Sequence, residues 1–189
     1  MNTAALTAAA LAALTLTLAG CSTDPAPTSS TGSSASSSSS SADVAPGDTS
    51  APPWPAPSDV PDRVAAAGLD LGPMGTAEHY HPHLSITIDG QPVPVTPNIG
   101  VDPTTGAMSA VHTHEGDGTI HIEADTVGEK FTLGQLFTQW GVALTPTQIG
   151  GVHAGAGEKV EVTSNGTPVP GNPADLLLEA DQQIELSLP

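Results

Sequence analysis

Residues 81–95 read HPHLSITIDGQPVPV, and this stretch decides the fold class. Leu84, Ile86 and Ile88 alternate with polar residues, which is the pattern of a strand with one buried face. The dipeptide Asp89-Gly90 favours a tight hairpin turn. Two prolines in the returning segment cannot donate to a neighbouring strand, so we expect that strand at the edge of a sheet.

Further strands and helices follow from the rest of the chain. Residues 110–124 (AVHTHEGDGTIHIEA) predict a second hairpin, residues 160–169 (VEVTSNGTPV) a third, and residues 182–188 (QQIELSL) a final strand. Residues 61–69 predict a short helix, and residues 131–141 the clearest helix of the chain. Thr132 is the predicted N-cap of this helix and forms a capping box with Gln135, and Gly141 is predicted to end it. Its apolar stripe consists of Leu133, Leu136, Phe137 and Trp140.

These elements predict an α+β domain, in which a small, mostly antiparallel sheet of hairpins packs on one main helix. A β-grasp-like arrangement is the first choice. A β-sandwich with one helix is the second.

The N-terminal region predicts that the protein is located outside the cytoplasm. Residues 1–20 carry no charge and end in small residues before Cys21, which favours a secretory signal peptide, although no basic residue follows Met1. The sequence Leu-Ala-Gly-Cys at 18–21 resembles the bacterial lipobox. That resemblance implies lipidation of Cys21, the only cysteine, and anchoring at the extracytoplasmic face of the cell membrane.

A Ser-, Pro- and Ala-rich segment follows and reads as a disordered tether over residues 21–58, since it has too few large apolar residues to form a core. Trp54 is expected to make only an incidental contact near the domain edge. The globular domain is expected over residues 59–189.

The composition excludes one class of partner. The net charge is −17, and only Arg63, Lys130 and Lys159 are basic. Phosphate backbones need Lys and Arg, so nucleic acid is not an expected partner. An acidic surface does raise the local concentration of cations.

The histidines form the main candidate site. All seven lie between residues 79 and 153, and most are spaced by two. Side chains at i and i+2 of a strand share one face, so HYHPH at 79–83 and HTH at 112–114 each predict clustered imidazoles. A four-residue hairpin loop would pair His112 with His121 and His114 with Thr119.

A shared metal ion suits this cluster. The candidate ligands are His79, His81, His83, His112, His114, His121 and Glu123. An imidazole-rich set without a thiolate favours Cu(II), Zn(II) or Ni(II) over Cu(I). Glu123 is a candidate ligand, an orienter of His121 or a general base, whereas His153 stands apart.

Several alternatives to metal binding stay open. Histidines on a polar sheet face can hydrogen-bond one another without an ion, or they can titrate and sense pH. A metal-free protein-interaction surface is a further alternative. A metal-dependent hydrolase, with Glu123 as its catalytic residue, is the alternative metal function. No HExxH or GxSxG motif is present, so the sequence leans away from an enzyme.

Three segments resemble a recurring domain of bacterial secreted and membrane-anchored proteins. In that group a histidine-rich HxHxH strand, an HTHD-x-TG-x-IH-x-E segment and an FTLGQFF-x-x-WG helix occur in the order seen here, across residues 63–188. Glu115 stands where the pattern has Asp, and Gly116-Asp117 replaces the next pair. The resemblance implies one intact domain and the same ligand set, and it names no reaction.

Overall fold

The computed structural model describes residues 50–189. The expected signal segment, Cys21 and most of the expected tether lie outside the described residues. Within residues 50–189, no helix is both long enough and apolar enough to cross a membrane.

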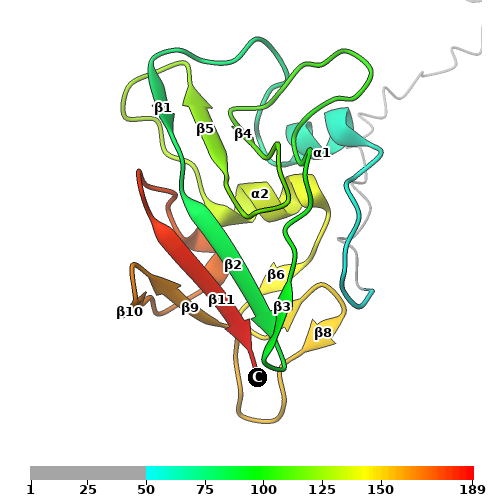
Figure 1. The fold of residues 1–189 in the computed structure, drawn as a ribbon, viewed down its shortest axis with the longest axis vertical. Helices are drawn as coiled ribbons and strands as arrows, with labels where there is room; N and C mark the ends of the chain where they lie inside the picture. The colour runs from blue at the N-terminus through cyan, green and yellow to red at the C-terminus, as the bar shows by residue number, and fades with distance from the viewer. Residues whose placement is uncertain (1–49) are drawn as a thin grey trace, which may run out of the picture. The chain divides into compact units, whose positions relative to one another are not determined.

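The largest sheet has five strands in the order β10-β9-β11-β2-β3 (Figure 1). These strands are β2 (His83–Ile88), β3 (Gln91–Val93), β9 (Glu161–Ser164), β10 (Thr167–Pro168) and β11 (Gln183–Leu188). The central pair, β2 and β11, runs parallel, and the other neighbours are antiparallel. The proline-containing β3 lies at the edge, as predicted.

The two hairpins of this sheet form at the predicted turns. Asp89 and Gly90 have φ values of 50° and 72°, and Asn165 and Gly166 have φ values of 51° and 75°. Type I′ hairpin turns need positive φ at both central residues, and these residue types adopt it readily. The turn chemistry therefore fixes the register of both hairpins.

Two smaller sheets complete the strand structure of residues 50–189. The first, in the order β1-β5-β4, consists of β1 (Glu78–Tyr80), β5 (His121–Ala124) and β4 (Val111–His112). The second, in the order β6-β7-β8, consists of β6 (Leu144–Thr145), β7 (Gln148–Ile149) and β8 (Val152–His153). The sequence did not indicate this third sheet, because its strands are too short to show an alternating pattern.

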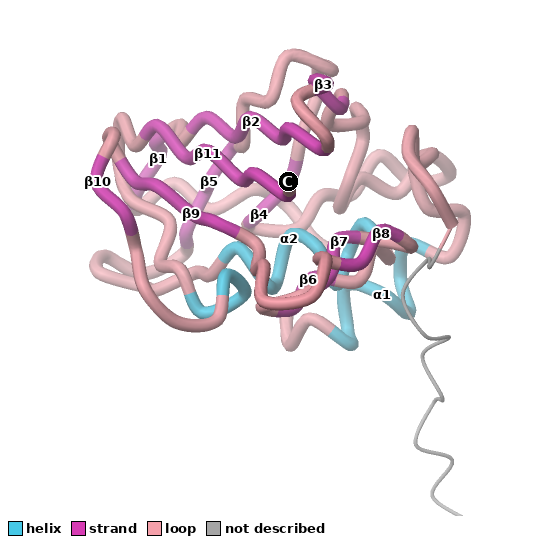
Figure 2. Tube along the Cα trace, turned by 90° about the horizontal axis from the view of Figure 1, so that it is seen from below, coloured by secondary structure: helices cyan, strands magenta, loops and turns pink. Residues whose placement is uncertain are grey.

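The main helix lies across the sheets. Figure 2 shows the five-stranded sheet on one side of the domain, with α1 (Val60–Ala66), α2 (Leu133–Trp140) and the β6–β8 sheet on the other. A short 3₁₀ helix, η1 (Pro173–Asp175), adjoins α2. The apolar sides of the sheet and of α2 belong to one buried cluster. The structure is therefore a small α+β fold, as predicted, and the β-grasp-like description stays a prediction.

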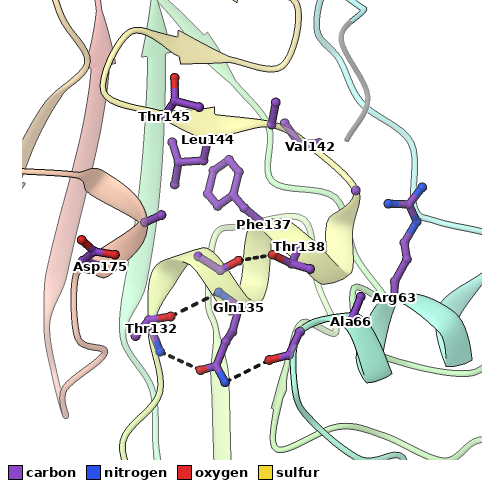
Figure 3. Close-up of a pocket in the computed structure, with 15 residues that line it drawn as sticks. Arg63, Ala66, Thr132, Gln135, Phe137, Thr138, Val142, Leu144, Thr145 and Asp175 are labelled. Atoms are coloured by element: carbon purple, nitrogen blue, oxygen red, sulfur yellow. Dashed lines mark hydrogen bonds between the residues drawn. The ribbon is translucent and has the colours of Figure 1, made fainter. Parts of the chain in front are cut away.

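The ends of α2 confirm the predicted capping. The Thr132 hydroxyl accepts from the Gln135 N–H, and the Gln135 side chain accepts from the Thr132 N–H (Figure 3). The Gln135 amide also donates to the Ala67 carbonyl, which ties α2 to the end of α1. Gly141 ends the helix with φ at 77°, a conformation that glycine adopts without strain.

Part of the segment assigned to the tether packs on the domain. Trp54 is only 2% exposed and stands edge-on to Trp140, with ring centroids 5.6 Å apart. The Trp140 indole N–H donates to the Pro55 carbonyl at 3.2 Å, and the Gly151 N–H donates to the Ser50 carbonyl at 2.7 Å. Trp54 is thus a core residue rather than an incidental contact. The packed region begins before residue 59, where the globular domain was expected to start.

We expect Trp54→Ala to lower the free energy of unfolding by about 3–5 kcal/mol, because truncating a buried aromatic side chain leaves a cavity. Urea unfolding followed by circular dichroism measures this loss. Val127→Ala, at a side chain that is 74% exposed, is the control and should stay within about 0.5 kcal/mol of the unaltered chain. A similarly small effect for Trp54→Ala would mean that the segment is not part of the core.

Candidate metal centre

The register of one strand assembles the site. β5 lies between β1 and β4, so its side chains meet partners from both neighbours. His121 pairs with His112 of β4, and Glu123 pairs with His79 of β1. Directly opposed residues share one sheet face. The predicted pairing of His112 with His121 is therefore confirmed.

The predicted pairing of His114 with Thr119 does not form. Thr119 makes an isolated antiparallel bridge to His83 of β2 instead, so the chain leaves the β4–β5 ladder after His112. Gly118 permits this path: its φ is 94°, and a Cβ there would collide with the Leu84 carbonyl oxygen. His114 still joins the cluster, from the loop rather than from a strand.

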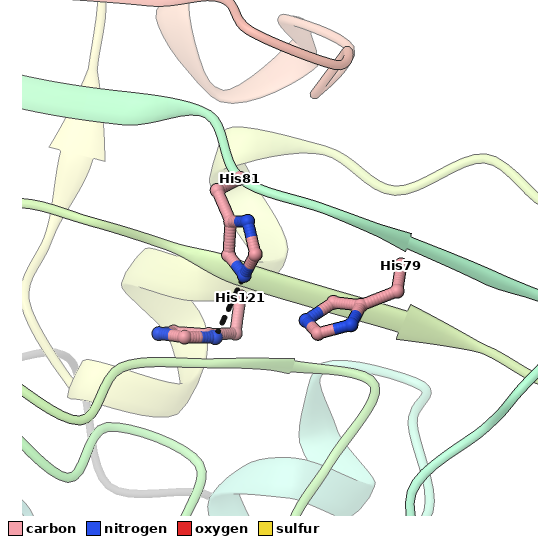
Figure 4. Close-up of side chains that lie close together, drawn as sticks. All are labelled: His79, His81 and His121. Carbon is pink, nitrogen blue, oxygen red and sulfur yellow. Dashed lines mark hydrogen bonds between the residues drawn. The ribbon is translucent and has the colours of Figure 1, made fainter.

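The first imidazole triad consists of His79, His81 and His121. Each residue offers a ring nitrogen, and the three nitrogens lie within 4.8 Å of one another. Figure 4 shows the three rings turned toward a common space, with His81 above His121 and His79 beside it. The His81 Nε2 and His121 Nδ1 atoms are 3.1 Å apart.

The second triad consists of His112, His114 and the same His121. Its three ring nitrogens also lie within 4.8 Å of one another. The Nε2 atoms of His112 and His114 are 3.1 Å apart. The His112 ring stacks on His121 at an interplanar angle of 15° and a centroid distance of 5.3 Å. His121 thus belongs to both triads and joins them into one five-histidine cluster.

The spacing of the ring nitrogens fits metal coordination. Two nitrogens that bind one tetrahedral ion, each about 2.0–2.1 Å from it, are about 3.3–3.4 Å apart. The distances of 3.1 Å within both triads are close to that value. One nitrogen pair of each triad is therefore already near coordination distance, and the third nitrogen lies within 4.8 Å of both.

A backbone carbonyl fixes the tautomer of His112. Its Nδ1 lies 2.8 Å from the Ser109 carbonyl oxygen, and a carbonyl can only accept. Nδ1 must therefore carry the proton, which leaves the Nε2 lone pair of the neutral ring turned toward His114. Metal-ligating histidines are usually oriented by this kind of hydrogen bond.

Burial keeps the centre of the cluster neutral. His112 is 0% exposed, and burial lowers its pKa to about 4. Burial also lowers the pKa of His121, with further lowering by the neighbouring His114 and His81. Neutral imidazoles are the ligating form, so protons compete weakly with a metal at these two residues near pH 7.

Glu123 borders the first triad. Its side chain is 8% exposed, and its Oε1 lies 3.3 Å from His79 Nε2. The other oxygen, Oε2, is buried without a hydrogen-bond partner among the described residues. A buried carboxylate oxygen without a partner is costly. It is a candidate to bind a cation directly.

The other candidate residues lie at or outside the edge of the cluster. Glu115 Oε2 is 4.0 Å from His121 Nε2. His83 belongs to neither triad, and its Nε2 donates to the Asp117 carbonyl at 2.8 Å. His153 is exposed in β8 and belongs to neither triad. The structure thus brings together five of the six predicted histidine ligands, with Glu123 beside them.

Sequence reasoning did not find Ser109. Its carbonyl orients His112, and its hydroxyl donates to the Val111 carbonyl at 2.8 Å. A backbone carbonyl acts whatever its side chain, so the sequence holds no signal for it. The hydroxyl bond forms a tight local turn that is equally hard to see in the sequence.

A surface pocket of about 530 Å³ lies away from the histidines, over α2 (Figure 3). Its lining includes Arg63, Gln135, Thr138 and Asp175, and contains no histidine. The Arg63 guanidinium is already paired with Asp59 at 2.7 Å. The concentration of ligating groups in the β1-β5-β4 sheet therefore makes that sheet the candidate functional site.

The low pKa of His112 predicts that stability depends on pH. Above about pH 6.5 the ring is neutral in both the folded and unfolded chain. As the pH falls toward about 4, the unfolded chain takes up a proton that the folded chain excludes. The free energy of unfolding should therefore fall by up to about 3 kcal/mol from this residue.

Urea unfolding in the presence of a chelator, between about pH 7 and pH 4.5, measures this loss. His112→Asn is the matched variant, because its amide can still donate to Ser109 but does not titrate. We expect its stability to fall less over the same range. Equal losses in both proteins would contradict this account of His112.

No known family model matches the chain, and neither a curated protein nor a solved structure matches it.

Proposed function

We propose that this chain binds a divalent transition metal, Cu, Zn or Ni, through its five-histidine cluster. The observation that carries the proposal is the pair of imidazole triads joined at His121. The five imidazoles form one donor set, in which the two pairs His79–His81 and His112–His114 are joined through His121. The role we propose is metal handling.

The chemistry of the donor set supports these metals. Imidazole suits Cu(II), Zn(II) and Ni(II), whereas Mg²⁺ and Ca²⁺ prefer oxygen ligands. The chain's only cysteine is Cys21, so no thiolate competes within the domain. The net charge of −17 draws cations toward the protein. Glu115 and Glu123 place carboxylates beside the cluster to offset an ion's charge.

The proposed location is the extracytoplasmic face of the cell membrane. The support is the apolar segment 1–20 followed by Cys21 in a lipobox-like sequence. The lipid would supply the attachment, because the acidic domain is repelled by anionic headgroups.

A metal-dependent hydrolase is the second candidate, and Glu123 is the observation that favours it. A hydrolytic metal site keeps one coordination position open and needs a placed base. Glu123 is a buried carboxylate: Oε1 lies 3.3 Å from His79 Nε2, and Oε2 has no hydrogen-bond partner among residues 50–189. Its alternative role, orienting His79 as a ligand, needs no reaction.

Calorimetric titration of the untagged full chain with Cu(II), Zn(II) and Ni(II) tests metal binding. We expect at least one metal to bind with a Kd below about 10 μM near pH 7. Binding should weaken below about pH 6, because protonated imidazoles cannot ligate.

Three variants locate the binding in this titration. The double variant His112→Ala/His121→Ala should lose at least about tenfold in affinity, and His81→Ala tests the cluster at an exposed position. His153→Ala is the control and should bind unchanged. Absence of binding tighter than about 10 μM, or equal binding by the double variant and the control, would refute the proposal.

Cys21→Ser tests the anchor. We expect this variant to be recovered in the soluble fraction after cell lysis, because Cys21 supplies the only thiol of the chain for a thioether-linked lipid. Immunoblotting of membrane and soluble fractions measures the distribution, with the unaltered chain as reference. Retention of Cys21→Ser in the membrane fraction would count against lipid anchoring.

A further inference from the structure

We infer that the cluster holds two metal ions, and that the imidazole of His121 bridges them through its two ring nitrogens. One ion would lie among His79, His81 and His121 Nδ1. The other would lie among His112, His114 and His121 Nε2. This inference rests on the proposed function, since it specifies how that cluster binds its metals.

The two nitrogens of His121 face different parts of the chain. Nδ1 lies 3.1 Å from His81 Nε2, on the β1 side of the ring. Nε2 lies 4.0 Å from the carboxylate of Glu115, the neighbour of His114 in the β4–β5 loop. A ring that ligated a single ion would need only one nitrogen turned toward other donors. Here each nitrogen faces a different ligating group, His81 Nε2 on the Nδ1 side and Glu115 Oε2 on the Nε2 side.

The rings around His121 are arranged in the same divided way. His81 and His114 both stand edge-on to it, each with a centroid distance of 4.6 Å. Each triad also contains a second close pair of rings. The ring centroids of His79 and His81 are 4.6 Å apart, and those of His112 and His114 are 4.7 Å apart. Each triad therefore has two imidazoles of its own and shares the third, His121, with the other triad.

Each triad also has its own carboxylate. Glu123 lies 3.3 Å from His79, and Glu115 lies 4.0 Å from His121 Nε2. Two ions bridged by one imidazole would be about 6 Å apart, from the width of the ring and metal–nitrogen distances of about 2.0–2.1 Å. Two cations this close repel each other, and a carboxylate beside each one offsets that repulsion.

The two positions differ in their access to water. The second triad contains the fully buried His112, whereas the His79 side chain of the first triad is 55% exposed. We therefore expect the ion at His112 and His114 to exchange slowly and the ion at His79 and His81 to exchange readily. Such a pair would retain one ion while passing the other to solvent or to a partner.

The bridge has a defined proton balance. A neutral imidazole carries one N–H, so the first ion takes the free lone pair of His121. When the second ion binds the other nitrogen, that N–H bond breaks and its proton passes to solvent. The bridged ring is then an imidazolate between two cations, and about one extra proton is released with the second ion.

Copper titration with spin counting tests the inference. The full chain, purified without an affinity tag, is loaded with Cu(II), and the bound copper is measured by elemental analysis. We expect two Cu(II) per chain, with an electron paramagnetic resonance signal well below that of two independent spins, because a bridging imidazolate couples them. Calorimetry in buffers of different ionisation enthalpy should show the extra proton.

The variants His81→Ala and His114→Ala separate the two positions. Each should bind one Cu(II) with the full signal of one spin, whereas the control His153→Ala should match the unaltered chain. A stoichiometry of one Cu(II), weakened by both variants, would overturn the inference and leave the proposed function standing. Two uncoupled spins would overturn the bridge. Absence of copper, zinc and nickel binding would refute the proposed function itself.

Discussion

The backbone pairing of β5 with strands on both sides is the constraint on which the candidate site depends. It places His121 opposite His112 and Glu123 opposite His79. Because side chains alternate along a strand, a shift of one residue would turn His121 into the opposite face and bring Ile122 into its place. Ile122 is fully buried, so such a shift would also expose part of the core. The hydrophobic core and the histidine cluster therefore fix the same register.

Burial converts this geometry into a chemical property. Histidines on an open sheet face would be solvated and partly protonated near their usual pKa. Here His112 is fully buried, and the Ser109 carbonyl holds its proton on Nδ1. The ring is kept neutral, with its Nε2 lone pair directed into the cluster. A site arranged in this way loses little in reorganisation when a cation binds.

Local sequence patterns predicted the parts of the molecule that local physics determines. The turns at Asp89 and Asn165 formed because their backbone preferences are intrinsic, and the capping box of α2 formed for the same reason. The pairing of β2 with β11 is parallel and joins distant segments, and both strands show the same alternation whichever way they pair. Tertiary contacts of this kind leave no signal in a single sequence.

In the candidate site, too, local patterns predicted some features, whereas others depend on long-range contacts. Spacing by two predicted clustered histidines, and the predicted hairpin paired His112 with His121 correctly but His114 with Thr119 wrongly. His83 lies outside the cluster and bridges Thr119 instead, and Trp54 is buried against Trp140. Both are contacts between segments that lie far apart in the sequence, so pattern alone could not predict them.

The claim that this cluster is a metal centre is tested most directly by anomalous X-ray diffraction from crystals of the zinc-loaded protein. The account predicts anomalous peaks between the imidazoles of the cluster, about 2.0–2.1 Å from the ring nitrogens, including those of His121. Peaks at surface carboxylates or at His153, with none at His121, would contradict it.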